Sequence, residues 1–348
     1  MNSLTVDHDS LWMLRAVELA RNGFGTTSPN PPVGAVIERD GLLLGEGYHE
    51  VAGEAHAEKR AIENARKRGN ESRMRGATLY VTLEPCSSHG RTAPCTDAII
   101  EAGIARVVYG AIDPDERHVG RANEILRAHG IEVCSGVCEL VCEHLVRSWA
   151  WSVKHRRPWV VAKVATTMDG RMTRRDDRWL SSPKALRHTH QLRAESDAIL
   201  VGGGTVRMDD PALTIRTPSQ PPSPRKKQPW RIIMTRDRKS LPPESCIFTD
   251  EHADRTVVME NVQDFKAMLE ELYSKYDIVN LMLECGGPLL RSFLERGLVN
   301  EWVQDIAPIL GGGPAPMLPG DYLPRECRFK EEEIMDYEPD IILRGILE

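Results

Sequence analysis

The sequence predicts an α/β protein of two domains, and three observations support this. The chain has 348 residues, a length more typical of two domains than of one. Apolar, strand-like segments alternate with helical ones in both halves, as in layered α/β domains. A polar and basic stretch, residues 154–158, separates the halves. We therefore expect domains at residues 1–153 and 154–348.

The first half reads as alternating helices and strands. Ser10 can cap a helix that continues to about Asn22 and stops at Gly23. Asp40-Gly41 is a hairpin signal between two apolar runs. The expected helices are residues 10–22, 54–68, 94–101 and 137–150, and the expected strands are residues 33–38, 42–47, 77–83 and 105–111.

The second half begins with a strongly apolar strand at residues 158–166. Further strands are expected at residues 198–201, 231–234, 255–259, 278–283 and 302–307. Helices between several of them favour a largely parallel sheet. Residues 217–229 are rich in Pro and Ser and predict a surface loop. Its three cations are more typical of a solvated loop than of a nucleic-acid patch.

His56, Glu58, Cys86 and Cys95 form the clearest chemical pattern in the chain. Zn²⁺ favours tetrahedral nitrogen and sulfur ligands, and a catalytic site leaves one position for water, which becomes acidic near neutral pH. Glu58 follows the first ligand by two residues and can carry that proton to a leaving amine, as in zinc deaminases. The alternatives are a closed structural zinc site or two unrelated buried thiols.

The spacing of the cysteines narrows this interpretation. Eight residues separate Cys86 from Cys95, whereas nucleobase deaminases usually have two. Together with the segments Ser28-Pro-Asn-Pro-Pro-Val-Gly-Ala-Val36 and Gly45-Glu-Gly-Tyr-His49, this long loop resembles the deaminase domain of the RibD family of riboflavin-biosynthesis enzymes. Blocks of the second half, among them residues 202–206, 209–214 and 284–288, resemble the reductase domain of the same family. The resemblance covers residues 10–345.

The resemblance implies a cytidine-deaminase-like three-layer domain followed by a dihydrofolate-reductase-like domain. The first would use zinc, held by His56, Cys86 and Cys95, to hydrolyse 2,5-diamino-6-(5-phosphoribosylamino)pyrimidin-4-one to its deaminated product, with Glu58 as the catalytic residue. Asn30 and His49 would contact that substrate. The second domain would use NADPH to reduce the ribosyl group to ribityl.

The implied reductase residues fall into two sets. NADPH would contact Thr166, Trp179, Thr205, Asp209, Thr235, Gly286 and Gly287. The substrate would contact Lys163, Arg178, Arg193, Leu213, Arg216 and Glu284. Guanidinium groups suit phosphate, although a single Arg is more often a surface residue and a single Trp a core residue. A Gly-Gly turn before a helix lets the backbone approach a pyrophosphate, but such turns are also common between a strand and a helix that bind no ligand. Either Asp209 or Lys163 could assist protonation.

The chain departs from the family pattern at several positions. Ser88 stands where a histidine is usual, Ala93 replaces a proline, and Asp115-Glu116 replaces Asn-Pro. In the reductase half, Met234 replaces a common Asp. One alternative is therefore that only one domain is active, the reductase. Another is a nucleic-acid base deaminase with a C-terminal binding module, which the net charge of −6 and the long cysteine loop disfavour.

Composition bounds the partners and the compartment. The pI is about 6.0, and no secretory signal or membrane-spanning run is apparent. Eight cysteines without a signal predict reduced thiols in the cytoplasm. We expect small phosphoribosylaminopyrimidine substrates and no nucleic-acid or membrane partner. The sequence does not determine the oligomeric state, and a homo-oligomer is one of the possibilities. Cys134, Cys138 and Cys142, with His144 nearby, favour core thiols over a second metal site.

Overall fold

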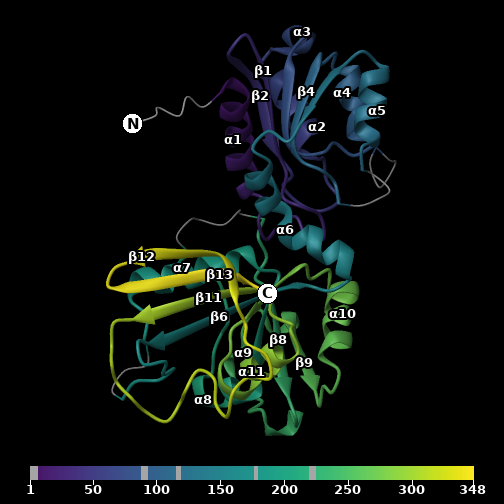
Figure 1. The fold of residues 1–348 in the computed structure, drawn as a ribbon. Coiled ribbons are helices and arrows are strands. Elements are labelled where there is room, and N and C mark those ends of the chain that lie inside the picture. The colour runs from purple at the N-terminus through teal and green to yellow at the C-terminus, as the bar shows by residue number, and fades with distance from the viewer. Residues whose placement is uncertain (1–6, 88–92, 115–118, 176–178, 219–224) are drawn as a thin grey trace, which may run out of the picture. The chain divides into compact units, whose positions relative to one another are not determined.

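The computed structural model describes residues 7–87, 93–114, 119–175, 179–218 and 225–348. The chain divides into two compact units whose main boundary lies between His155 and Arg156, and each is described by itself (Figure 1). The boundary expected from the sequence falls two residues earlier, inside the last turn of a helix. Lys154 and His155 extend that helix because cations are favourable at a helix C-terminus.

The first unit is a five-stranded sheet with the order β2-β1-β3-β4-β5. β1 pairs antiparallel with β2 and β3, whereas β3, β4 and β5 are parallel. Its elements are α1 (His8–Arg21), β1 (Gly34–Arg39), β2 (Leu42–Tyr48), α2 (Ala57–Lys67), α3 (Glu71–Met74), β3 (Thr78–Leu83), α4 (Cys95–Glu101), β4 (Arg106–Ala111), α5 (Arg121–Ala128), β5 (Glu132–Ser135) and α6 (Glu139–His155).

Alternating side chains of the strands fill two cores, one on each face of this sheet. On one face, Leu79 and Val81 pack with α2, α4 and α5. On the other, Tyr80 and Val108 pack with α1 and α6. Helices therefore cover both faces, which confirms the expected three-layer domain.

Several boundaries in this unit differ from the sequence prediction. The cap of α1 is Asp7, whose Oδ1 accepts a hydrogen bond from the backbone N–H of Ser10 at 2.8 Å, so Ser10 lies inside the helix. α2 begins at Ala57, and His56 is its N-cap residue rather than part of its first turn. Asp40 and Gly41 both have positive φ, as a tight hairpin turn requires, and the predicted hairpin is confirmed.

The second unit is an eight-stranded sheet with the order β12-β13-β11-β6-β10-β7-β8-β9. The strands from β11 to β9 are parallel, as expected. Its longer elements are β6 (Trp159–Thr167), α7 (Pro183–Glu195), β7 (Ala198–Gly202), α8 (Gly203–Asp209), β8 (Trp230–Thr235), β9 (Thr256–Glu260), α10 (Phe265–Tyr276), β10 (Asn280–Leu283), α11 (Gly287–Glu295), β11 (Glu301–Ala307), β12 (Phe329–Tyr337) and β13 (Asp340–Leu347). Short helical turns occupy Arg238–Ser240, Cys246–Thr249 and Ala253–Arg255.

One face of the second sheet is an apolar core. Val160, Ala162 and Val164 of β6 are buried there together with residues of α10 and α11. The residues between them, including Lys163, point to the opposite face, because side chains alternate along a strand. The carboxyl ends of the parallel strands meet at one edge, where open α/β sheets usually bind ligands. No helix among the described residues is long and apolar enough to cross a membrane.

Candidate active sites

Three elements of the first unit bring the predicted metal ligands together. His56 precedes α2, Cys86 follows β3, and Cys95 is the first residue of α4. His56 Nδ1 lies 3.5 Å from Cys86 Sγ and 3.4 Å from Cys95 Sγ. In a tetrahedral site with ordinary Zn–N and Zn–S bonds, that separation is about 3.6 Å. The three side chains therefore fit a zinc ion.

The electrostatics of the two thiols also suit a cation. A hydrogen bond between the thiols is the largest of the effects that lower the pKa of Cys86 to about 4, with the imidazole of His56 adding to it. The backbone N–H of Cys95 also donates to Cys86 Sγ at 3.3 Å. The same thiol–thiol interaction, followed by burial, raises the pKa of Cys95. One thiolate is thus favoured by the protein, and the second needs the charge of a metal.

Glu58 lies beside this group in the first turn of α2 and is only 3% exposed. Burial raises its pKa, which favours a carboxyl group that can hold a proton. It lines a cavity of about 250 Å³ whose other lining residues are Asn30, Pro31, Val33, His49, His56, Leu83, Glu84, Cys86, Asp113 and Trp149.

The two predicted substrate residues of this cavity contact each other. Asn30 Nδ2 lies 3.1 Å from His49 Nε2, and His49 Nδ1 lies 3.2 Å from the carbonyl oxygen of Ala55. This arrangement fits a neutral ring that donates from Nδ1 and accepts at Nε2. Burial lowers the pKa of His49, in agreement with the neutral form.

The sequence did not single out Glu84, Asp113 or Trp149 as part of this site. Glu84 directly precedes the Pro85-Cys86 pair, and Asp113 lies in the segment that departs from the family pattern, so those contexts were the available signals. Ser88, Asp115 and Glu116 lie outside the described residues. Ala93 is exposed, and its carbonyl oxygen accepts a hydrogen bond from Lys59 Nζ.

The second cysteine group does not assemble as a metal site. Cys142 is fully buried, and Cys134 and Cys138 pack against the same core. Among the His, Cys, Asp and Glu side chains that the structure describes, those of His56, Cys86 and Cys95 form the group that lies close enough together to hold a metal ion.

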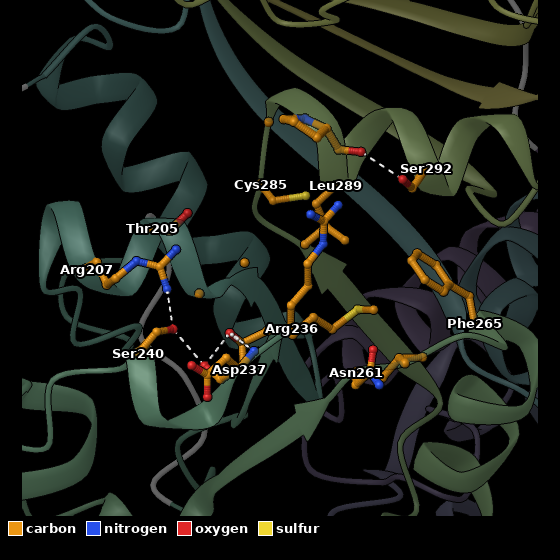
Figure 2. Close-up of a pocket in the computed structure, with 18 of the residues that line it drawn as sticks. Thr205, Arg207, Arg236, Asp237, Ser240, Asn261, Phe265, Cys285, Leu289 and Ser292 are labelled. Atoms are coloured by element: carbon orange, nitrogen blue, oxygen red, sulfur yellow. Dashed lines mark hydrogen bonds between the residues drawn. The ribbon is translucent and has the colours of Figure 1, made fainter.

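The second unit has a larger cavity, of about 710 Å³, at the carboxyl edge of its sheet (Figure 2). It is formed by the ends of β7, β8, β9 and β10 with α8 and α11. Of the residues expected to contact NADPH, Thr205, Thr235 and Gly286 line it. Gly287 is adjacent, begins α11 and has φ +58°, a conformation that favours glycine.

The remaining predicted cofactor residues do not line this cavity. Thr166 is buried on β6, where its Oγ1 accepts a hydrogen bond from Gln304 Nε2 at 2.8 Å. Trp179 is half exposed, and Asp209 is exposed at the end of α8. The structure thus brings together the glycine-rich part of the predicted set and leaves these three apart from it.

Three arginines in the cavity were missed by the sequence analysis. They are Arg207 on α8, Arg236 after β8 and Arg296 after α11. Arg207 Nη1 donates to Ser240 Oγ at 2.9 Å. Figure 2 shows Arg236 extending from the end of β8 towards Leu289 of α11. Each is an isolated residue in the sequence, so no motif marks it, and only the fold gives them a common cavity.

The predicted reductase-substrate residues form a charged group on the other face of β6. Arg193 of α7 makes a bidentate pair with Glu284, with Nη2 2.6 Å from Oε1 and Nε 2.9 Å from Oε2. Arg193 Nη1 also donates to the carbonyl oxygen of Thr214 at 3.1 Å. Burial alone would raise the pKa of Glu284, but Arg193 and then Lys163 lower it below its usual value.

The other members of the predicted reductase-substrate set are Leu213, Arg216 and Arg178. Leu213 is buried with φ +50°. The backbone N–H of Arg216 donates to His190 Nδ1 at 3.3 Å, while its side chain is exposed. Arg178 lies outside the described residues. Lys163, Arg193 and Glu284 are therefore the members that the fold gathers most closely.

Comparisons with known proteins agree with both sites. Residues 6–111 match the family model for the cytidine and deoxycytidylate deaminase zinc-binding region, and residues 158–343 match that for the RibD C-terminal domain. A zinc-binding deaminase domain and a reductase domain imply zinc and a nicotinamide cofactor.

Full-length relatives cover nearly the whole chain. The riboflavin biosynthesis protein RibD of Escherichia coli K12 is 38% identical over 96% of this chain and 98% of its own. That of Mycobacterium tuberculosis H37Rv is 37% identical over 94% of each chain. The structure is similar to that of Acinetobacter baumannii RibD, with a TM-score of 0.88 at 34% identity over 98% of this chain and 99% of that one.

A second solved structure also matches both units. A diaminohydroxyphosphoribosylaminopyrimidine deaminase/5-amino-6-(5-phosphoribosylamino)uracil reductase from Thermotoga maritima gives a TM-score of 0.84 at 34% identity, over 97% of this chain and 98% of that one. The cytidine-deaminase-like and dihydrofolate-reductase-like fold classes expected from the sequence are thereby confirmed. With its two sites and these full-length relatives, the chain belongs to the RibD family of riboflavin biosynthesis proteins.

Proposed function

We propose that this chain catalyses two successive reactions on one substrate: hydrolytic deamination of 2,5-diamino-6-(5-phosphoribosylamino)pyrimidin-4-one, then reduction of its ribosyl group to ribityl by NADPH. It is an enzyme of riboflavin biosynthesis with a zinc-binding deaminase domain and a reductase domain. The observation that carries the proposal is the convergence of His56, Cys86 and Cys95 on one cavity with the buried Glu58. We assign deamination to residues 1–153 and reduction to residues 154–348.

In the deaminase, His56, Cys86 and Cys95 would hold the zinc, which supplies Lewis acidity that makes a bound water easier to deprotonate. Glu58 accepts a proton from the attacking water and delivers it to the departing nitrogen, so that ammonia leaves and oxygen replaces it. Asn30 and His49 orient the pyrimidine ring. Both ring nitrogens of His49 are already paired, Nε2 with Asn30 and Nδ1 with the carbonyl oxygen of Ala55, so His49 acts on the pyrimidine by fixing the orientation of the Asn30 amide.

In the reductase, the cavity at the carboxyl edge would hold NADPH, which supplies the hydride. Its volume of about 710 Å³ is within the range of small-molecule and cofactor sites. Arg207, Arg236 and Arg296 offer guanidinium groups for the phosphates, and Gly286-Gly287 at the start of α11 allows close backbone approach. An arginine near the adenosine ribose favours NADPH over NADH, because it can bind the 2′-phosphate.

The reductase substrate would meet Lys163, Arg193 and Glu284, with Leu213 and Arg216 nearby in the chain. The bidentate pair fixes Glu284 next to Lys163, so the substrate's sugar hydroxyls would find one acceptor and one donor in defined positions. The exposed Arg216 is suited to the substrate phosphate.

The decisive experiment is turnover of the diaminopyrimidinone ribosyl phosphate by the zinc-loaded enzyme, with products resolved by mass. Without NADPH, we expect a product in which oxygen has replaced one amine. With NADPH, this product should gain two hydrogens. If deamination alone fails, only the reductase is active. If the substrate is not turned over either with or without NADPH, the proposal is refuted. Titration with NADPH and NADH tests the choice of cofactor.

A further inference from the structure

The register of the second sheet places an acidic residue diagonally across from Lys163. β11 pairs parallel with β6, and Asp305 of β11 is opposite Ala165, two residues after Lys163. Residues two apart on a strand share a face, and so do directly paired residues of adjacent strands. Asp305 and Lys163 therefore point to the same side of the sheet, away from its apolar core.

A second carboxylate approaches Lys163 from the opposite neighbour of β6. β10 pairs parallel with β6, and Leu283, its last residue, is opposite Ala162. Glu284 follows Leu283 and so comes level with Lys163. The charge of Lys163 is one of the effects that lower the pKa of Glu284, which indicates that the two groups lie close together.

Asp305 and Lys163 form an ion pair that is almost completely removed from solvent. Lys163 Nζ lies 2.9 Å from Asp305 Oδ2, and the two side chains are 6% and 1% exposed. Ser181 Oγ and Thr189 Oγ1 are 3.3 and 3.5 Å from the same oxygen. Asp305 Oδ1 is also buried, and among the described residues it has no hydrogen-bond partner. The carboxylate is therefore held mainly through one oxygen.

Stability alone gives little reason for such a pair. Removing two charges from water costs about as much as their attraction returns, and apolar pairs of similar volume are often as stable. A lysine also has a long, flexible stem with several rotatable bonds. An anion fixed on the sheet and braced by Ser181 and Thr189 restricts where that ammonium can lie.

We infer that Asp305 is a positioning residue of the reductase, which holds the Lys163 ammonium beside Glu284 in the orientation that the sugar of the substrate requires. The inference rests on the proposed role of Lys163 in the reductase site. Asp305 itself is too buried to meet substrate, so it acts through Lys163. A displacement of about 1 Å in a reacting group can cost on the order of 100-fold in rate.

The test measures steady-state reduction of preformed deaminated substrate by the full-length enzyme. Asp305→Asn keeps the shape but removes the charge, and Asp305→Glu keeps the charge but shifts it by one methylene. We expect both to lower kcat for reduction at least about tenfold while KM for NADPH stays the same. Asp305→Asn should also change the pH–rate profile, because Lys163 loses its fixed counter-charge. Deamination should not change in either variant.

Glu301→Gln is the matched control. Glu301 is on the same strand, is 6% exposed, and accepts hydrogen bonds from Arg344 Nε and Trp159 Nε1. Glu301→Gln disturbs an ion pair at the start of β11 in which the Glu301 side chain is 9% and the Arg344 side chain 40% exposed. The variant should therefore lower the unfolding temperature without the loss of kcat. If Asp305→Asn does not fold, Asp305→Glu carries the test alone, since the charge remains.

The outcomes separate this inference from the proposed function. If Asp305→Glu and Asp305→Asn retain the kcat and pH profile seen in the Glu301→Gln control, Asp305 does not position Lys163. If Lys163→Met reduces the substrate normally, Lys163 is outside the reductase site and the assignment on which the inference rests is wrong. Loss of reduction in Lys163→Met, with normal Asp305 variants, would leave the proposed function intact and overturn the inference alone.

Discussion

Replacing Glu58 with glutamine tests the proton transfer most directly. The two side chains have nearly the same shape, and Glu58 is 3% exposed in a cavity that also holds the metal-ligand group. The substitution therefore removes a titratable carboxyl group with little change in packing. We expect Glu58→Gln to keep its zinc and fold normally but to lose deamination.

The expected loss of rate follows from the acid–base role of this carboxyl group. General acid–base catalysis is worth about 10²–10⁴-fold in rate. At about 1.36 kcal/mol per factor of ten, this range corresponds to about 2.7–5.4 kcal/mol of barrier. Because Glu58 both accepts the proton of the water and returns it to the leaving nitrogen, we expect the upper part of the range.

The assay measures ammonia release with saturating substrate, with zinc content determined by elemental analysis in parallel. Glu63→Gln is the control, since Glu63 is exposed on the same helix α2. It should retain full activity, and NADPH oxidation on preformed deaminated substrate should be normal in both variants. Deamination within a few-fold of wild type in zinc-loaded Glu58→Gln would refute the proposed proton transfer.

Three further predictions concern the metal, the cofactor turn and stability. Cys86→Ser should lose zinc and deamination and keep the reduction of preformed substrate; elemental analysis that finds unchanged zinc would contradict the ligand assignment. Gly287→Val forces a branched residue to adopt φ +58° at the start of α11, so it should weaken NADPH binding about tenfold or more in a fluorescence titration. The control is Gly130→Val, which places the same residue at φ +75° in the other unit and should leave NADPH binding unchanged. Asp9 accepts hydrogen bonds from Arg106 at 2.7 Å on both oxygens and from Tyr80 at 2.8 Å, so Asp9→Asn should destabilise the first unit by about 1.5–3 kcal/mol at pH 7. Hydrogen bonding from Arg106 is the main effect that lowers the pKa of Asp9. The contribution of Asp9 to the free energy of unfolding is therefore full above the ordinary carboxyl pKa near 4 and disappears as the pH falls through the lowered value. Urea unfolding of wild type and Asp9→Asn should give free energies that converge in acid.

Local sequence patterns predicted the elements that carry strong signals. The hairpin of β1 and β2 follows from Asp40-Gly41, and the buried strands β3, β4 and β6 follow from their apolar runs. β12 was missed because most of it is exposed and charged, with three consecutive glutamates at residues 331–333, so no burial pattern marks it. Only pairing with β13 makes it a strand.

The deaminase centre was also largely predictable, because its ligands stand in a compact motif whose chemistry is restrictive. The reductase site was less so. The arginines of its cavity lie on separate elements, and the pairing of Lys163 with Asp305 depends on the register of two strands more than a hundred residues apart in sequence. Spacing along the chain carries no information about such contacts.

The placement of the metal ligands has a mechanical consequence for the first unit. His56, Cys86 and Cys95 belong to the start of α2, the end of β3 and the start of α4, with sequence separations of 30 and 9 residues between successive ligands. An ion bound to all three would join these elements as a cross-link and restrict the unfolded chain, much as a disulfide does. The same ion that serves the reaction would thus tie α2 and α4, which pack on the same face of the sheet, to the end of β3. Its loss would loosen the architecture that shapes the substrate cavity.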